Sequence, residues 1–502
     1  MLRQRIFTNT LLNSSGKSLV LVLQLFIIAY LIKTLGNETY GIAVLALSLA
    51  GNTNLLEAGF GLSVTKYIAE YKAKGDEKRL LEIVNTNFLV ATVIALFFCL
   101  ILSGINEFFL EKIFTIPSPL LLDAKNLIWV LIPFLVVEAW SVSIIRVAEG
   151  FQRYSQARAA DLLKWFLRVI FVVIAVSIGY GLVGVGIAYL LSGIITLVVL
   201  YFMVFFRHSS LRLMPWISSK ETFRQLFGFS VWIFLSKVFA FLSYRIDTIV
   251  IGIFLPPANL AYYQVAFKLY DVLRYGLSLI SSVLVPVTSE LDAMRDARRI
   301  SLLFEKATKY SVLLMYPIFI LALFYVDWVI RFWVGDGFET SVLLSNLFVL
   351  SLFGIAVISS GAEMMVGADR VKMLIQYNAI ATAVNLILSI YLIRKIGVAG
   401  VVVGTLVGSV VIFMTYLPVM MKTFDVRPRI FLSNVIFKNT LPLLVLFCGL
   451  YFIAGYLGSI VGLAGYMLIS ILFLIDKEDR KMFQFARAWG SNSSGSGVRE
   501  QD

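Results

Sequence analysis

The sequence predicts an all-α polytopic membrane protein with about fourteen transmembrane helices. Of its 502 residues, 60% are hydrophobic and only 15% are charged, a composition that a water-soluble fold cannot bury. Apolar runs also recur along almost the whole chain, and each approaches or exceeds the roughly 20 residues that cross a bilayer as a helix. Because unpaired backbone cannot face lipid, each run is expected to be helical.

The predicted spans follow one another with short connections and end near residue 475. They are residues 10–33, 39–65, 82–106, 122–145, 158–179, 181–206, 225–255, 259–288, 308–330, 342–366, 371–393, 397–421, 433–456 and 458–475. The first is not expected to be a cleaved signal peptide, because Lys17 and its polar neighbours interrupt the apolar run and no small-residue cleavage site follows.

Basic residues fall mainly on alternate connections. If the N-terminus is cytoplasmic, the inner segments, including the stretch from Arg146 to Arg168, hold 32 of the 43 Lys and Arg, and the outer segments hold six. The positive-inside rule then predicts that both termini are cytoplasmic and that the number of spans is even. This bias also accounts for the net charge of +13 without a nucleic-acid partner.

An internal repeat appears when the chain is aligned with itself at an offset of about 220 residues. Residues 69–80 and 289–300 are identical at four of twelve positions. The aligned pairs include Asp76 with Asp296, Arg79 with Arg299 and, further along at a similar offset, Gly184 with Gly400. Six predicted spans separate matching positions, so the halves share one orientation, as in secondary transporters with a central site between two bundles.

The repeat predicts five parts. They are an N-terminal six-helix bundle (1–206), a cytoplasmic linker (207–224), a C-terminal six-helix bundle (225–421), two additional transmembrane helices (433–475) and a partly disordered cytoplasmic tail (476–502).

Several kinds of chemistry are not expected. Cys99 and Cys448 lie in apolar runs, and with a single histidine, His208, and no CxxC pair, neither a disulfide framework nor a zinc site is predicted. The sequence has no phosphate-binding loop and no soluble domain to hold one. No cofactor, resident metal or catalytic residue is therefore expected, and we do not expect an enzyme.

Three segments resemble the polysaccharide transporter family. They are YGIAVLALSLAGNTNLLEAGFGLSVTKYIAEYKAKGD from Tyr40, IDTIVIGIFLPPANLAYYQVAFKLYD from Ile246 and GADRVKMLIQYNAIATAVNLILSIYLIRKIGVAGVVVGT from Gly367. That family includes flippases for lipid-linked O-antigen and capsule repeat units. It belongs to the multidrug/oligosaccharidyl-lipid/polysaccharide exporter superfamily, which also contains multidrug extrusion antiporters.

The resemblance covers about residues 1–475 and implies two six-helix bundles around a central cavity. It implies translocation of a polyprenyl-diphosphate-linked oligosaccharide from the inner to the outer leaflet of the cytoplasmic membrane. Polysaccharide-assembly proteins are further expected partners. The family has no short catalytic signature, so its site residues cannot be transferred to this sequence.

A flippase for such a substrate needs cations within its spans, where ionisable groups usually face an interior or a cavity. The candidate substrate-binding cations are Lys17, Lys237, Arg245, Lys268 and Arg274. Lys17 and Lys237 match across the repeat, although a lysine near a helix end also snorkels to the interface. Asp271 lies three residues from Lys268 and from Arg274, so it can pair with either. An ion-pair network that only joins spans seven and eight is the structural alternative.

Acidic residues within the spans are candidates for coupling transport to H⁺ or Na⁺, or for balancing the cations. They are Glu57, Glu138, Asp247 and Asp271. The alternative functions are a multidrug or cation antiporter and a flippase for the peptidoglycan lipid precursor. A membrane polysaccharide polymerase or glycosyltransferase is less favoured, because such enzymes need an extended loop or domain and every connection here is short.

Overall fold

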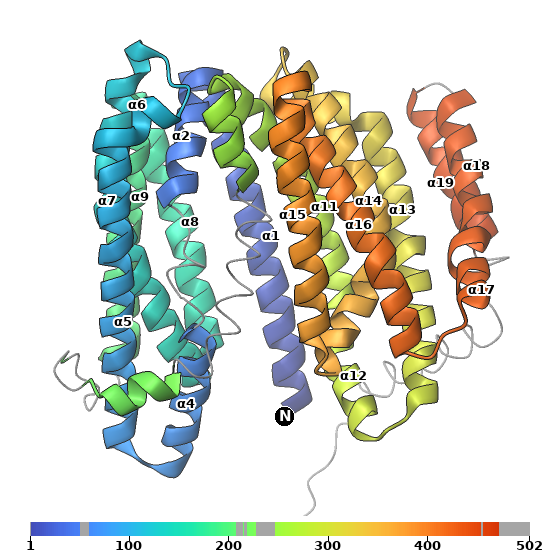
Figure 1. Cartoon of the computed structure of the whole chain (residues 1–502), viewed down its shortest axis with the longest axis horizontal. Coiled ribbons are helices and arrows are strands. Elements are labelled where there is room, and N and C mark those ends of the chain that lie inside the picture. The colour runs from blue at the N-terminus through green and yellow to red at the C-terminus, as the bar shows by residue number, and fades with distance from the viewer. Residues whose placement is uncertain are drawn as a thin grey trace, which may run out of the picture. The chain divides into compact units, whose positions relative to one another are not determined.

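The computed structural model describes residues 2–50, 60–206, 214, 218–226, 246–452 and 455–470. The regular elements in these residues are helices (Figure 1), which confirms the predicted all-α class. The described residues fall into two compact units: the first holds those within 1–272, 326–348 and 375–412, and the second holds those within 273–325, 349–374 and 413–502. The division into two six-helix bundles, a linker and two extra helices stays a prediction.

The helices of the first half overlap the predicted spans, and several extend beyond the predicted bounds. They are α1 (Leu2–Leu35), α2 (Asn37–Ala50), α4 (Phe60–Lys74), α5 (Glu77–Gly104), a π-helical turn (Ile105–Phe109), α6 (Leu110–Ile113), α7 (Ser118–Gly150), α8 (Tyr154–Ser177) and α9 (Gly181–Phe205). Residues 246–254 are also helical and lie within predicted span seven.

The helices of the second half follow the same pattern. They are α11 (Ala258–Ser281), α12 (Leu284–Ala293), α13 (Ala297–Val334), α14 (Glu339–Gly367), α15 (Val371–Ile396), α16 (Val398–Thr423), α17 (Pro428–Phe431), a π-helical turn (Leu432–Phe437), α18 (Lys438–Phe452) and α19 (Gly455–Ile469).

Nine helices in the described residues are long and apolar enough to cross a membrane, so the chain is a polytopic membrane protein. Helices α18 and α19 are apolar but shorter. Helix α8 is long enough to span, but it carries four charged residues: Arg158, Asp161, Lys164 and Arg168. This charge keeps α8 out of the nine and makes it a candidate to carry the function.

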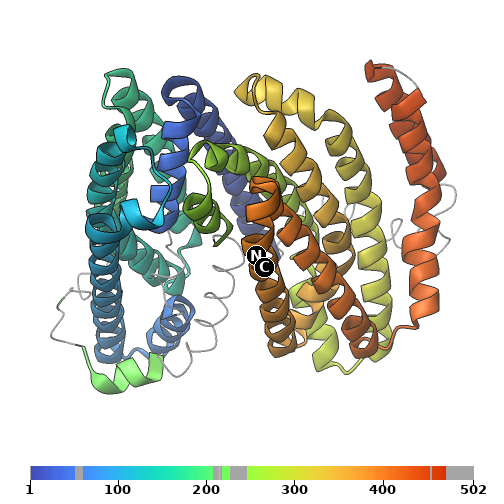
Figure 2. The ribbon, with the colours of Figure 1, turned by 45° about the horizontal axis from the view of Figure 1, so that its top comes forward.

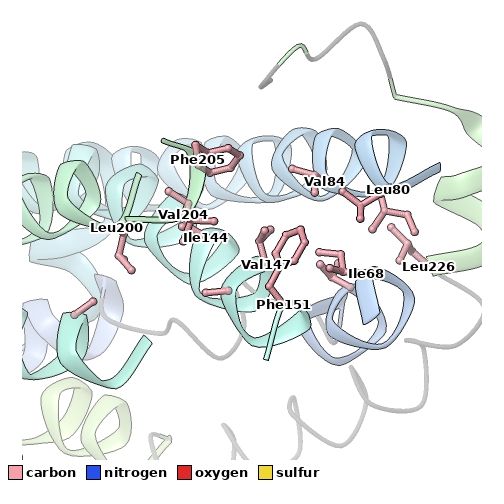
Figure 3. Close-up of a cluster of buried hydrophobic side chains, with 14 residues drawn as sticks. Ile68, Leu80, Val84, Ile144, Val147, Phe151, Leu200, Val204, Phe205 and Leu226 are labelled. Carbon is pink, nitrogen blue, oxygen red and sulfur yellow. The ribbon is translucent and has the colours of Figure 1, made fainter. Parts of the chain in front are cut away.

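Helix α7 is the centre of the first unit. It packs against α2, α4, α5 and α9, while α8 packs against α1 and α9; both views show α5, α7 and α9 side by side (Figures 1 and 2). Near the end of α7, Val147 meets Ile68 of α4, Val84 of α5 and Val204 of α9 in one buried cluster (Figure 3). Gly150 permits this packing, because a Cβ there would lie 2.7 Å from the Ile68 side chain.

The internal repeat is visible as matching local structure. Asp76 and Asp296 each accept a hydrogen bond through Oδ1 from the backbone N–H three residues later, at Arg79 and Arg299, both at 3.0 Å. This is the usual way to cap the first turn of a helix. The residue before each aspartate has a left-handed backbone, with φ of 70° at Gly75 and 55° at Arg295. Both halves thus begin a helix with the same turn.

Candidate functional site

A cavity of about 440 Å³ lies in the first unit between α1, α2, α7, α8, α9 and α11. Helices α1, α2 and α11 each turn one face toward it, with residues at helical spacing. These are Gln24, Ile27, Ile28 and Leu31 of α1, Tyr40, Val44, Leu47 and Ser48 of α2, and Gln264, Phe267, Lys268 and Asp271 of α11. The remaining lining comes from Phe134 and Glu138 of α7, Lys164, Trp165 and Arg168 of α8, and Tyr189 of α9.

Two of the lining cations, Lys164 and Arg168, were not among the candidates from the sequence. The count of loop charges had assigned both to an inner segment, but the structure buries both within α8. Arg168 lies about 21 Å along the helix axis from Tyr154, at 1.5 Å per residue. The signal was present, since predicted span 158–179 contains both residues and they lie one turn apart on one face.

Lys164 is paired with Glu138 across the α7–α8 interface. Its Nζ donates a hydrogen bond to Glu138 Oε1 at 2.7 Å, and both side chains are buried. Asp161 on α8 lies farther from the same ammonium, at 3.8 Å. The second carboxylate oxygen of Glu138, Oε2, is buried and has no hydrogen-bond partner in the described structure. Glu138 therefore neutralises Lys164 and keeps one acceptor unused.

Arg168 is held by aromatic rings. Its guanidinium carbon lies 3.9 Å from the ring centre of Tyr189, 4.7 Å from that of Trp165 and 5.7 Å from that of Phe134. Such stacking on ring faces stabilises a cation without using its N–H donors. Nε and Nη2 of Arg168 are buried and have no acceptor among the described residues. Since an unpaired buried donor is costly, this guanidinium is suited to receive an anion.

Lys268 supplies the third cation of the cavity from α11. Its Nζ donates to Gln24 Oε1 of α1 and, at 2.9 Å, to Asp271 Oδ2. The pairing of Lys268 with Asp271, expected from their spacing, is therefore present in the structure. Lys268 and Lys164 each have a carboxylate partner, whereas Arg168 has an aromatic box.

Asp247 lies outside the cavity lining, in a separate buried cluster of the first unit. Its Oδ2 accepts hydrogen bonds from Tyr263 Oη at 3.1 Å and from Thr405 Oγ1 at 3.0 Å. Asn385 donates through Nδ2 to the same threonine oxygen at 3.4 Å and accepts through Oδ1 from Ser389 Oγ at 2.8 Å. The other Asp247 oxygen, Oδ1, is buried without a hydrogen-bond partner in the part of the chain that the structure describes.

The other candidates from the sequence are placed as follows. Lys17 is exposed on α1, seven residues before Gln24 and thus on the same helix face, about 10 Å farther along. Arg274 belongs to the second unit and is not among the lining residues. Three other candidates, Lys237, Arg245 and Glu57, lie outside the described residues.

One end of α2 is in direct contact with the turn that precedes α11. Gly41 lies so close to this turn that a Cβ built on it would be 1.9 Å from the carbonyl oxygen of Pro257. One turn later, Leu45 packs on Gly252, where an added Cβ would lie 2.8 Å from Leu45 Cδ1. The backbone N–H of Thr115 also donates to Gly252 O at 3.0 Å. Gly41 and Leu45 lie beside the cavity-lining Tyr40 and Val44, so α2 contacts this turn on one face and the cavity on another.

Two solved structures with similar folds are described as a flippase and a transporter. A lipid II flippase MurJ in an inward closed conformation superposes with a TM-score of 0.75 and 15% identity, over 92% of this chain and 98% of that one. A multidrug resistance MATE family transporter of the MOP superfamily, in an inward-facing conformation, superposes with a TM-score of 0.67 and 15% identity, over 80% of this chain and 94% of that one. At this identity the likeness shows the fold alone.

Sequence relatives point the same way. The "Putative O-antigen transporter" of Shigella flexneri is 21% identical over 80% of this chain and 94% of its own length. The "Probable low-salt glycan biosynthesis flippase Agl15" of Haloferax volcanii is 22% identical over 36% of this chain and 39% of its own length. The model of a family described as "Polysaccharide biosynthesis protein" matches residues 6–292. Because this match spans more than half of the chain, the protein belongs to the polysaccharide biosynthesis protein family.

Proposed function

We propose that this protein is a flippase that moves a polyprenyl-diphosphate-linked oligosaccharide repeat unit from the inner to the outer leaflet of the cytoplasmic membrane by alternating access. The observation that carries the proposal is Arg168, a buried guanidinium at a cavity with two unused N–H donors. A diphosphate offers charged acceptors in the geometry that a guanidinium prefers. The flippase and O-antigen transporter descriptions of the relatives support this class of substrate.

The polarity of the cavity favours this function over cation extrusion. Lys164 and Lys268 are each neutralised by a carboxylate, and the remaining charged group, Arg168, is positive. A cationic drug would therefore meet a like charge at Arg168, which opposes binding. A peptidoglycan lipid precursor shares the diphosphate, so the part of the headgroup beyond the diphosphate would have to separate the two cargoes.

We assign ion coupling to Asp247, rather than to Glu138 or Asp271. Glu138 and Asp271 already balance lysines, whereas Asp247 has only hydroxyl donors and one unused oxygen among the described residues. A carboxylate in that setting can take up H⁺ or a small cation such as Na⁺. Both termini would be cytoplasmic, and the Gly41–Pro257 contact would lie on the outer side.

The test uses the purified chain in proteoliposomes with a fluorescent lipid-linked oligosaccharide, and it measures the fraction that becomes accessible in the opposite leaflet. Wild-type protein should speed this transfer. Arg168→Gln should slow it at least about tenfold, since hydrogen bonds to charged groups contribute about 1.5–3 kcal/mol. Arg158→Gln is the matched control, because Arg158 lies on the same helix, pairs with Asp161 at 3.4 Å and is not part of the lining.

Three results would reject the proposal. The first is that wild-type protein transfers the lipid no faster than empty vesicles do, and the second is that Arg168→Gln and Arg158→Gln lose transfer equally. The third is that the protein takes up an organic cation against a proton gradient faster than it transfers the lipid-linked oligosaccharide. Formation of glycosidic bonds by the purified protein would instead favour a polymerase or glycosyltransferase. Comparison with the peptidoglycan lipid precursor in the same vesicles decides between the two lipid-linked cargoes.

A further inference from the structure

We infer that Glu138 acts as a tethered counter-anion. It pairs with Lys164 when no ligand is bound, and it is displaced when a diphosphate binds to Lys164 and Arg168. This inference rests on the proposed function, because it takes the diphosphate of a lipid-linked substrate as the ligand. It assigns to Glu138 control of how tightly that ligand is held and how readily it leaves.

The first support is the register of two helices. On α8, Lys164 and Arg168 lie four residues apart and share a face; on α7, Glu138 and Phe134 do the same. Lys164 meets Glu138 at 2.7 Å, and Arg168 meets the Phe134 ring at 5.7 Å. The sequence thus places two cations one turn apart on α8 but only one carboxylate opposite them on α7.

The second support is the unused hydrogen-bonding capacity at this place. Nε and Nη2 of Arg168 and Oε2 of Glu138 are buried and lack partners in the described structure, although all belong to side chains that line the same cavity. Glu138 and Arg168 are each 5% exposed. A bound anion would satisfy the arginine donors, and release of Glu138 from Lys164 would provide a second cation one turn away. Cβ atoms at this spacing are about 5–6 Å apart, which suits two adjoining phosphate groups.

The third support is electrostatic. With Glu138 ionised, the group of Lys164, Arg168 and Glu138 has a net charge of +1, and without it the charge would be +2. Without Glu138, Lys164 would keep only the more distant Asp161, at 3.8 Å. Two buried cations with so little compensation would be costly to fold and would bind a dianion so tightly that release limits transport, because affinity differences appear mostly in the dissociation rate. A carboxylate on a neighbouring helix lowers both costs, since it pairs with Lys164 whenever the ligand is absent.

The test measures binding of inorganic pyrophosphate to the purified, full-length protein in nanodiscs by isothermal titration calorimetry. Glu138→Gln should bind pyrophosphate at least about tenfold more tightly than wild type, and Glu138→Asp, which keeps the charge, should stay within about threefold of wild type. Glu149→Gln is the matched control. Glu149 is another buried glutamate of α7, is paired with Arg146 at 2.6 Å, and lies eleven residues from Glu138, about 16 Å along the helix.

A second variant keeps the inference open to refutation if Glu138→Gln alone does not fold. Glu138→Gln with Lys164→Gln removes both members of the pair, which a buried site tolerates better than removal of one. The double variant keeps the net charge of +1 through Arg168, so its affinity for pyrophosphate should stay within about threefold of wild type. Adding Arg168→Gln to either variant should abolish binding.

Unchanged or weaker binding by Glu138→Gln overturns the inference, and so does equal tightening by Glu149→Gln or Glu138→Asp. If Glu138 had only a structural role, changes in pyrophosphate affinity would follow disturbed folding rather than lost charge. Glu149→Gln or Glu138→Asp would then tighten binding as much as Glu138→Gln does. The transfer assay separates the two proposals. If wild-type protein moves the lipid-linked oligosaccharide but Glu138→Gln does not tighten pyrophosphate binding, the function stands and the counter-anion is rejected. The reverse result rejects the function and retains the anion site.

Discussion

The contact between Gly41 and the turn at Pro257 gives a steric prediction whose size follows from the structure. A Cβ at position 41 would lie 1.9 Å from the Pro257 carbonyl oxygen, whereas ordinary contact begins near 3.4 Å. Gly41→Ala therefore requires the helix or the turn to move by about 1.5 Å, and overpacking of this kind typically costs about 1–3 kcal/mol. If the contact opens during transport, this cost falls on the closed arrangement alone. Gly41→Ala then raises the population of the open arrangement relative to the closed one by about five- to 150-fold.

Thiol labelling reports this equilibrium directly. Cys99 and Cys448 are first replaced by alanine, and Leu45→Cys then places one thiol at a side chain that is buried against Gly252 in the closed contact. A membrane-impermeant maleimide should label this thiol at least about fivefold faster when Gly41→Ala is also present, because the reagent reaches it only in the open arrangement.

Gly104→Ala is the matched control, since a Cβ at Gly104 meets no atom within 4 Å. It should leave the labelling rate unchanged. Equal rates in wild type, Gly41→Ala and Gly104→Ala would refute the reasoning, provided that the variants remain monodisperse and unfold at similar temperatures. Such a result would mean that the turn at Pro257 rearranges to accommodate the added methyl group while α2 stays in contact with the turn.

Three further predictions test other parts of the molecule. Arg168→Lys keeps the charge but loses the planar fork that stacks on Tyr189, so transfer of the lipid-linked oligosaccharide should fall about tenfold, measured in proteoliposomes with wild-type protein as reference. Asp247→Asn removes the proposed coupling carboxylate; transfer should lose its response to an imposed Na⁺ or H⁺ gradient, and a response equal to that of wild type would contradict the assignment. Gly150→Val crowds Ile68, whose side chain would lie 2.7 Å from the new Cβ, and should lower the free energy of unfolding by about 1–3 kcal/mol. Denaturant unfolding in detergent measures this loss, and Gly104→Val should show none.

The sequence predicted local features that depend on residues near one another along the chain. The pairing of Lys268 with Asp271 follows from a three-residue spacing. The repeat aligned Asp76 with Asp296, and the structure adds that both cap a helix in the same way. The all-α membrane class was likewise predictable, because lipid forces nearly every apolar run into a helix. Composition and spacing are sufficient for properties of this kind.

The same local reasoning failed on α8. A count of basic residues treated Lys164 and Arg168 as loop charges, because a basic cluster near a span end usually marks the cytoplasmic side. Only packing against α7 and α9 reveals that one of these cations meets Glu138, 26 positions away in sequence, and the other meets Tyr189. No spacing rule connects residues on three helices.

By itself, then, the sequence determined that the chain spans a membrane as helices and that charges lie within its spans, and it predicted a duplication. The tertiary structure decided which of those charges share a cavity, which are neutralised by a partner, and that Arg168 keeps unused donors. The physical reason is that the backbone hydrogen bonds of a helix are satisfied within one segment, whereas the charge of a site is the sum over side chains from several segments.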